Sequence, residues 1–117
     1  MGDIALEQFE SQVTSLCAAS PIVVGISTVA AGVTWLHLRA YLVDGSFADT
    51  FYNDVSGRTA FALIKNQRRI FGADNTGGWH WHPFEDPDNH RPADGAVSFH
   101  DFLDQVEAWI KASGSQR

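Results

Sequence analysis

The sequence predicts an α+β protein, in which an antiparallel β-sheet of about five strands forms a meander and the N- and C-terminal helices pack on one face of it. Helical spacing of apolar residues occurs near the two ends of the chain. Between the ends, short segments rich in β-branched and aromatic residues alternate in polarity. Short turn signals such as Asp44-Gly45 and Ser56-Gly57 separate these segments, and short turns join antiparallel neighbours.

The N-terminal helix is predicted over residues 3–18, with Asp3 as its cap, because apolar side chains recur there at spacings of three and four. Pro21 separates this helix from the next segment. Residues 22–30 are rich in β-branched side chains and predict the first strand.

Residues 33–43 give the clearest strand signal. One face of this strand is purely apolar and is expected to pack under the helices: Leu36, Leu38, Ala40 and Leu42. The opposite face is mixed in character: Val33, Trp35, His37, Arg39 and Tyr41. Since a sheet covered on one side leaves its other face partly wet, we expect this mixed face to be able to form the floor of a site.

Three further strands are predicted over residues 47–53, 59–65 and 68–74. Residues 75–97 then show little periodicity and many Gly, Pro, Asp and Asn residues, which predicts a long loop. Loops of this length are usually functional or disordered, and the aromatic residues of this one argue against disorder. The last helix is predicted over residues 98–112, where an apolar stripe follows a capping pattern.

Composition narrows the possible functions of this single domain of 117 residues. The net charge of −6 argues against broad nonspecific binding to nucleic acid, although a local basic site remains possible. Cys17 is the only cysteine, so an internal disulfide and a multi-thiolate zinc site are excluded, and we expect a buried thiol. No apolar run reaches the roughly 20 residues that cross a bilayer, and the acidic N-terminus lacks a signal-peptide pattern. We therefore expect a cytoplasmic protein that does not contact a membrane.

The predicted loop carries an unusual group of histidines and tryptophans. In an extended backbone, His80 and His82 project to one face, while Trp79 and Trp81 project to the other. Pro83 favours this extended geometry, since the residue before a proline is pushed out of the helical region.

One chemistry that these residues can support is a metal site. Imidazole is the commonest protein ligand for zinc and similar ions, and His80 and His82 can chelate one divalent ion. Asp74 or His90 can supply a third ligand, which leaves a position for water. In the alternative interpretation, the histidines only tie the loop to backbone carbonyls and nearby carboxylates.

A second chemistry is metal-free cleavage of a phosphodiester, with one histidine as base and another as acid. An arginine or lysine would stabilise the charge that develops on the phosphate. An exposed tryptophan can stack on an RNA base. The catalytic candidates are His80, His82, His90, Arg69 and Asp74. The substrate-binding candidates are Lys65, Arg68, Trp79, Trp81 and Asn75.

From about residue 33 to 110, the chain resembles the TumE-type toxin components of prokaryotic toxin–antitoxin operons. Three segments carry the resemblance: FYNDVSGRTAFALIKNQRRIFGADN, then WHWHPFEDPDNH, then SFHDFLDQVEAW. Within them the family pattern maps onto Arg69, Asp74-Asn75, His80, His82, Pro83 and His90. The resemblance implies a small cytoplasmic protein that a helix-turn-helix antitoxin binds and neutralises.

Two functions therefore remain open at this point. The first is a toxin-like protein that acts on nucleic acid, with possible RNA cleavage at the histidine-rich loop. The second is a non-enzymatic binding or interaction domain whose histidine loop is structural or ordered by a metal ion.

Overall fold

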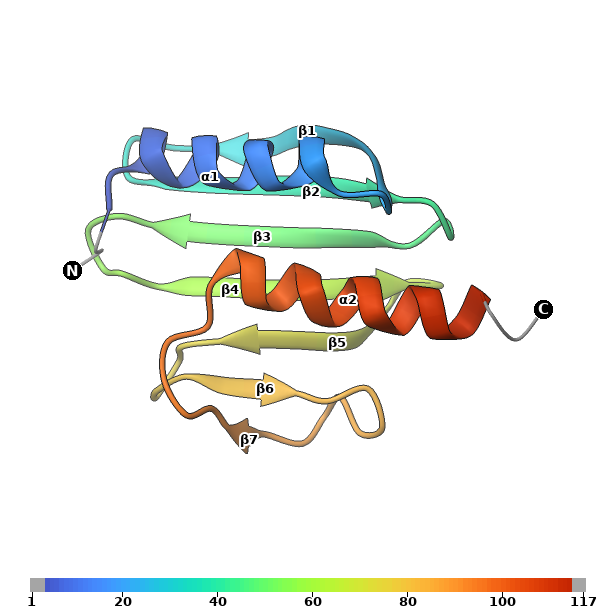
Figure 1. Cartoon of the computed structure of the whole chain (residues 1–117). Helices are drawn as coiled ribbons and strands as arrows, with labels where there is room; N and C mark the ends of the chain where they lie inside the picture. The colour runs from blue at the N-terminus through green and yellow to red at the C-terminus, as the bar shows by residue number, and fades with distance from the viewer. Residues whose placement is uncertain (1–3, 115–117) are drawn as a thin grey trace.

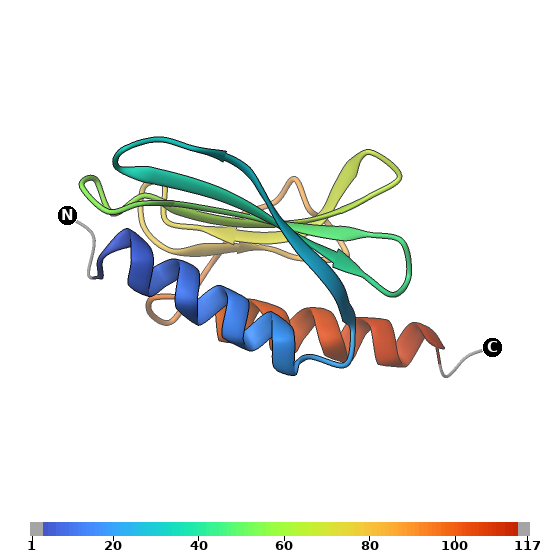
Figure 2. The same cartoon turned by 90° about the horizontal axis from the view of Figure 1, so that it is seen from above.

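The computed structural model describes residues 4–114 and shows a seven-stranded antiparallel sheet with two helices on one face (Figures 1 and 2). The strands follow one another in the sheet in chain order, from β1 to β7, so the predicted meander is confirmed. The elements are α1 (Leu6–Ala19), β1 (Val23–Ala31), β2 (Trp35–Leu42), β3 (Phe47–Asn53), β4 (Thr59–Lys65), β5 (Arg68–Asp74), β6 (His80–His82), β7 (Arg91–Pro92) and α2 (Phe99–Gly114).

Helix α1 packs over strands β1 to β3 and buries one stripe of side chains, including Phe9, Val13 and Cys17. The Cys17 thiol is buried as expected, and this burial raises its pKa to about 11, so it stays protonated and unreactive at neutral pH. Ala5 occupies the N-cap position without a side-chain cap. The predicted cap, Asp3, lies outside the described residues.

The two faces of the sheet differ in solvent exposure, as the alternation of residues 33–43 predicted. Side chains on the helix side of β2 are buried, and those on the opposite side, which we call the open face, remain partly exposed. The core lies between the helix side of the sheet and the two helices, and it is rich in aromatic rings. Phe102 of α2 sits at its centre, fully buried, with its ring 5.4 Å from that of Phe61 and 5.7 Å from that of Phe71.

The segment after β5 is more ordered than the sequence indicated. Residues 75–97 were predicted as a loop, but they contain the three-residue strand β6 and the two-residue strand β7. Gly77 and Gly78 both have positive φ, which lets the chain turn from β5 back into β6. Strands this short leave no periodic pattern in the sequence. The sequence therefore predicted about five strands, whereas the sheet has seven.

Helix α2 begins after a reciprocal cap. The Ser98 hydroxyl accepts a hydrogen bond from the Asp101 backbone N–H, and the Asp101 carboxylate accepts one from the Ser98 N–H. Among the described residues, no helix has both the length and the apolar character to cross a membrane.

The central position of Phe102 leads to a stability prediction. Phe102→Ala would leave a cavity among three aromatic neighbours and should lower the free energy of unfolding by about 3–5 kcal/mol in urea titrations. His100→Ala, at an exposed position of the same helix, is the control and should change it by less than about 0.5 kcal/mol. Equal effects of the two changes would contradict this account of the core.

Candidate functional site

The open face carries a cluster of three histidines and one aspartate, which we call the histidine cluster: Asp74, His80, His82 and His90. Pairing between β5 and β6 places His80 opposite Asp74 and His82 opposite Gly72. Directly opposed residues of an antiparallel pair share a face of the sheet, so both imidazoles project beside the Asp74 carboxylate. The prediction that His80 and His82 share one face is confirmed.

The Asp74 carboxylate lies between the two imidazoles. Its Oδ1 is 3.2 Å from His80 Nε2, and its Oδ2 is 2.9 Å from His82 Nε2. All three side chains are largely shielded from solvent, and the side chain of His82 is only 4% exposed. Electrostatic interactions are stronger in such a shielded place than at the surface.

Backbone carbonyls orient both rings from their other side. The Nδ1 atom of His80 is 3.0 Å from the Gly78 carbonyl oxygen, and that of His82 is 3.1 Å from the Pro87 carbonyl oxygen. A carbonyl oxygen can only accept a hydrogen bond, and the same is true of the carboxylate oxygens that the two Nε2 atoms face. A neutral imidazole has one N–H, so it can donate to the carbonyl or to the carboxylate but not to both. Both acceptors of a ring are satisfied when the ring carries two protons, or when its Nδ1 donates to the carbonyl and its Nε2 binds a metal ion.

His90 completes the cluster from the segment between β6 and β7. Its ring lies parallel to that of His80, with centroids 4.6 Å apart, and edge-on to that of His82, with centroids 4.7 Å apart. One ligand atom from each of the three histidines lies within 4.8 Å of the others. The three histidines are therefore close enough to bind one metal ion. His90 is the exposed member and faces solvent.

The Asp74 carboxylate is held in its ionised form by its neighbours. Partial burial raises its pKa, but the hydrogen bonds from His82 and from the Thr76 backbone, with the charges of His80 and His82, outweigh burial and lower it overall. Asp74 is therefore available as an anionic ligand at neutral pH.

Arg69 lies at the edge of the histidine cluster. Its guanidinium donates a hydrogen bond to the Pro87 carbonyl oxygen at 3.1 Å, the same oxygen that accepts from His82. A bulge between β4 and β5 brings this about, since Leu63 pairs with Phe71 while the next residue, Ile64, pairs with Arg69.

The other two predicted cations lie away from the cluster. Lys65 and Arg68 pair at the far end of the β4–β5 hairpin, six residues along β5 from Asp74, or roughly 20 Å in an extended strand. The Lys65 ammonium lies 3.3 Å from the Asp44 carboxylate and over the Trp109 ring.

The two predicted stacking tryptophans point to the helix side of the sheet. Trp79 stacks on Phe61, with ring centroids 6.2 Å apart, and Trp81 stacks on Phe71 at 5.5 Å. Both are partly buried against the core. They anchor the segment that carries the histidines, as its aromatic content suggested, and they do not share the open face with them.

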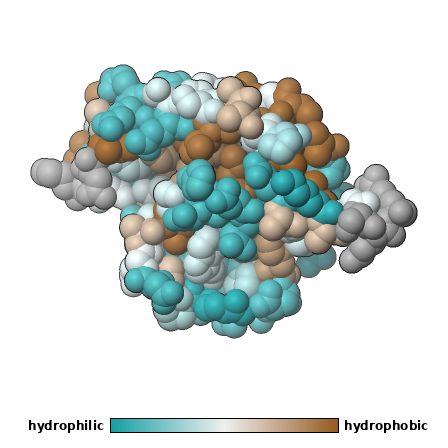
Figure 3. Space-filling view, in the orientation of Figure 1, coloured by the Kyte–Doolittle hydropathy of each residue, from teal (hydrophilic) through white to brown (hydrophobic). Residues whose placement is uncertain are grey.

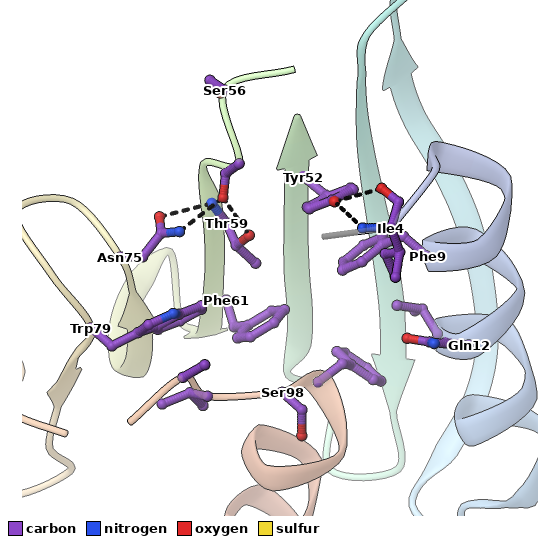
Figure 4. Close-up of a pocket in the computed structure, with 15 residues that line it drawn as sticks. Ile4, Phe9, Gln12, Tyr52, Ser56, Thr59, Phe61, Asn75, Trp79 and Ser98 are labelled. Atoms are coloured by element: carbon purple, nitrogen blue, oxygen red, sulfur yellow. Dashed lines mark hydrogen bonds between the residues drawn. The ribbon is translucent and has the colours of Figure 1, made fainter. Parts of the chain in front are cut away.

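Asn75 and Trp79 line a separate cavity of about 420 Å³ on the helix side (Figure 4). Phe9, Tyr52, Phe61 and other apolar side chains form most of its wall. The Asn75 side chain holds the β3–β4 hairpin. Its amide oxygen accepts a hydrogen bond from the Thr59 N–H at 2.9 Å, and its amide nitrogen donates one to the Gly57 carbonyl at 2.8 Å.

A second polar cluster lies further along the open face, where His37 and Arg39 were expected as part of the floor of a site and Asp49 was not named. The Asp49 carboxylate accepts two hydrogen bonds from Arg39, at 2.8 and 3.2 Å, and lies 3.2 Å from His37 Nε2. The alternation in residues 47–53 places Asp49 opposite Arg39, and this pattern could have revealed the pair.

Comparison with known proteins returns no match: no family model, no curated protein and no solved structure is similar to the chain at a significant level. The resemblance to the TumE-type toxins therefore stays a prediction based on the motif.

The orientation of the rings can be tested by nuclear magnetic resonance. When a metal ion binds through both Nε2 atoms, the proton of His80 and of His82 should reside on Nδ1, because each Nδ1 then donates to a carbonyl. Long-range ¹⁵N–¹H correlation spectra at a pH well above the ordinary histidine pKa of about 6.5 would identify the tautomer.

His37 serves as the internal control in the same spectra. Its Nε2 faces Asp49, so its neutral ring should carry the proton on Nε2. Nε2–H tautomers at both His80 and His82 in zinc-saturated protein would contradict metal binding through these two Nε2 atoms.

Proposed function

We propose that the histidine cluster binds a divalent metal ion and cleaves phosphodiester bonds in nucleic acid, as part of a toxin-like protein. One observation carries the proposal: two imidazoles whose Nδ1 atoms face backbone carbonyls direct both Nε2 atoms at one carboxylate. Backbone carbonyls orient metal-binding histidines in this way in many proteins.

The spacing of the three groups fits a small transition-metal ion. Bond lengths of about 2.0–2.1 Å in a tetrahedral zinc site separate neighbouring ligand atoms by roughly 3.3 Å. His80 Nε2 lies 3.2 Å from Oδ1 of Asp74 and His82 Nε2 lies 2.9 Å from Oδ2, so each nitrogen is near this ligand spacing from one oxygen of the same carboxylate. Two nitrogens and one carboxylate oxygen favour zinc and its neighbours over calcium or magnesium, which prefer oxygen ligands alone.

His90 is assigned the position next to the substrate, because it is the exposed histidine and lies against both ligand rings. A bound ion would polarise the phosphate and lower the pKa of a water molecule. In hydrolysis the water oxygen bonds to phosphorus as one P–O bond breaks. One proton of the water leaves to a base, and the departing oxygen receives one, a transfer that the His90 imidazole can perform. Arg69 shares the Pro87 carbonyl with His82, and it is the cation that we assign to balance charge on the phosphate.

The ordered motif from Arg69 to His90 supports the toxin-like character and RNA as the substrate, through its resemblance to the TumE-type toxins. A helix-turn-helix antitoxin encoded beside the gene is the corresponding partner. Presence of such a gene next to this one would support that part of the proposal, and its absence would count against it.

A second candidate function rests on the deep burial of His82. This ring is 4% exposed and both of its nitrogens have partners, as in a purely structural centre. In that case a metal ion or a proton orders residues 75–97 of a non-enzymatic interaction domain, and His90 would be a fourth ligand that closes the site.

Metal binding is tested on purified protein by elemental analysis and by zinc titration calorimetry. We expect one ion per chain, an increase in melting temperature with zinc, and loss of both in His82→Ala and Asp74→Asn. His100→Ala, whose ring is exposed on α2, is the matched control and should bind normally. A protein that binds no divalent ion and has the same melting temperature with and without chelator would contradict the proposed metal site.

The His90→Ala variant separates the two candidate functions. If His90 acts on substrate, the variant should keep its metal ion but cleave labelled RNA at least about a hundredfold more slowly. If His90 is a closing ligand, the variant should lose metal affinity instead, and the wild-type protein should cleave nothing.

A further inference from the structure

We infer that the open face beside the histidine cluster binds single-stranded nucleic acid, with one base stacked on the ring pair formed by Phe51 and Trp35. This inference rests on the proposed function, because it describes how a substrate would reach the same site. It adds a substrate class, the single strand, and a binding surface on β2, β3 and the β3–β4 hairpin.

The strand register aligns this surface with the cluster. Phe51 pairs with Ala60, and Ala60 pairs with Asp74, so the three residues form one row across the open face. Two strand spacings separate Phe51 from Asp74, or about 10 Å. The methyl group of Ala60 is the only side chain between them in this row. A phosphate at the histidine cluster can therefore have its neighbouring nucleotide over Phe51.

Phe51 and Trp35 form a stacked pair on this face, with ring centroids 6.1 Å apart and planes inclined by 24°. Neither ring is fully buried. Aromatic rings that stand on the open face of an antiparallel sheet stack nucleic-acid bases in several RNA-binding domains. Stacking is available only to bases that are not paired in a duplex, which selects a single strand.

Arg58 supplies a cation at the same place. Its guanidinium lies 5.7 Å from the centroid of the Phe51 ring, and the residue is exposed in the hairpin between β3 and β4. The guanidinium lies over the ring face, so a base that stacks on Phe51 would take its place there and the flexible arginine side chain would turn to the phosphate of the same nucleotide.

The distribution of charge also favours this face. The two helices on the opposite side carry five carboxylates, at Glu7, Glu10, Asp101, Asp104 and Glu107, and only one basic residue, Lys111. Hydrophilic side chains cover much of the outer surface of the helix side (Figure 3). On the open face of strands β2–β6 there are only two carboxylates, Asp49 and Asp74, and each lies against histidine or arginine. The exposed carboxylates of Asp86 and Asp88 lie on either side of Pro87, at the β6 edge of the cluster. An anionic strand is therefore repelled from the helix side and from this edge, and it can approach the open face over β2–β4.

The test measures binding separately from cleavage. Short fluorescent oligonucleotides of one sequence, as single-stranded RNA, single-stranded DNA and duplex RNA, would be titrated against metal-free protein and followed by anisotropy. We expect single strands to bind at least about tenfold more tightly than the duplex. Equal affinity for RNA and DNA would assign recognition to stacking and phosphate, and a preference for RNA would add the 2′-hydroxyl.

Two variants locate the surface. Phe51→Leu keeps an apolar side chain in the sheet but removes the ring, and it should raise the dissociation constant about five- to tenfold. Arg58→Gln should lower the slope of log Kd against log salt by about 0.7. Lys111→Gln, on the helix side, is the matched control for charge and should change neither quantity.

The outcomes distinguish this inference from the proposed function. Cleavage that persists with an unchanged KM in Phe51→Leu and Arg58→Gln overturns the binding surface and leaves the catalytic proposal standing. Single-strand binding that both variants weaken, in a protein that never cleaves, supports the surface and removes the catalysis. Binding of none of the three oligonucleotides overturns the inference and leaves the open face to a protein partner.

Discussion

The packing of two tryptophans against the core determines on which face the histidines lie. Trp81 stacks on Phe71, and Trp79 stacks on Phe61, both on the helix side of the sheet. Because side chains alternate along an extended strand, His80 and His82 must then project to the open face. A slip of one residue between β5 and β6 would bury the imidazoles against the core and expose the indoles. The stacking energy of the tryptophans therefore maintains the register on which the histidine cluster depends.

The short strands β6 and β7 would be marginal without that anchoring, since two or three residues make few ladder hydrogen bonds. Further contacts inside the segment hold them in place. The Pro87 carbonyl accepts hydrogen bonds from both His82 and Arg69, which ties the turn after β6 to β5. The polar groups of the cluster thus have two roles. They order the segment, and they present two ring nitrogens and a carboxylate at one point.

The large elements of this fold were predictable from the sequence for identifiable reasons. The strict alternation in β2 predicted the apolar face of the sheet, and the short turns between β2 and β5 predicted the meander. The shared face of His80 and His82 followed from the same period of two. Trp79 and Trp81 were considered as exposed rings for base stacking, but both pack on the helix side. The local sequence pattern does not indicate which side of a short strand faces the core. The position of Arg69 depends on a bulge, and His90 is brought in by a turn, so neither could be derived from spacing alone.

Two adjacent residues link the histidine cluster to the proposed binding surface. Asp74 faces the cluster, while the side chain of Asn75 bonds to Gly57 and Thr59, on either side of Arg58. The β3–β4 hairpin that carries Arg58 is therefore braced against the end of β5 that carries the carboxylate. These hydrogen bonds join the two parts of the site through a single peptide unit. Sites built on such rigid supports lose little entropy when a ligand binds, because the groups that contact it are already in position. We therefore expect the proposed binding surface to receive an extended nucleic-acid strand without rearrangement of the sheet.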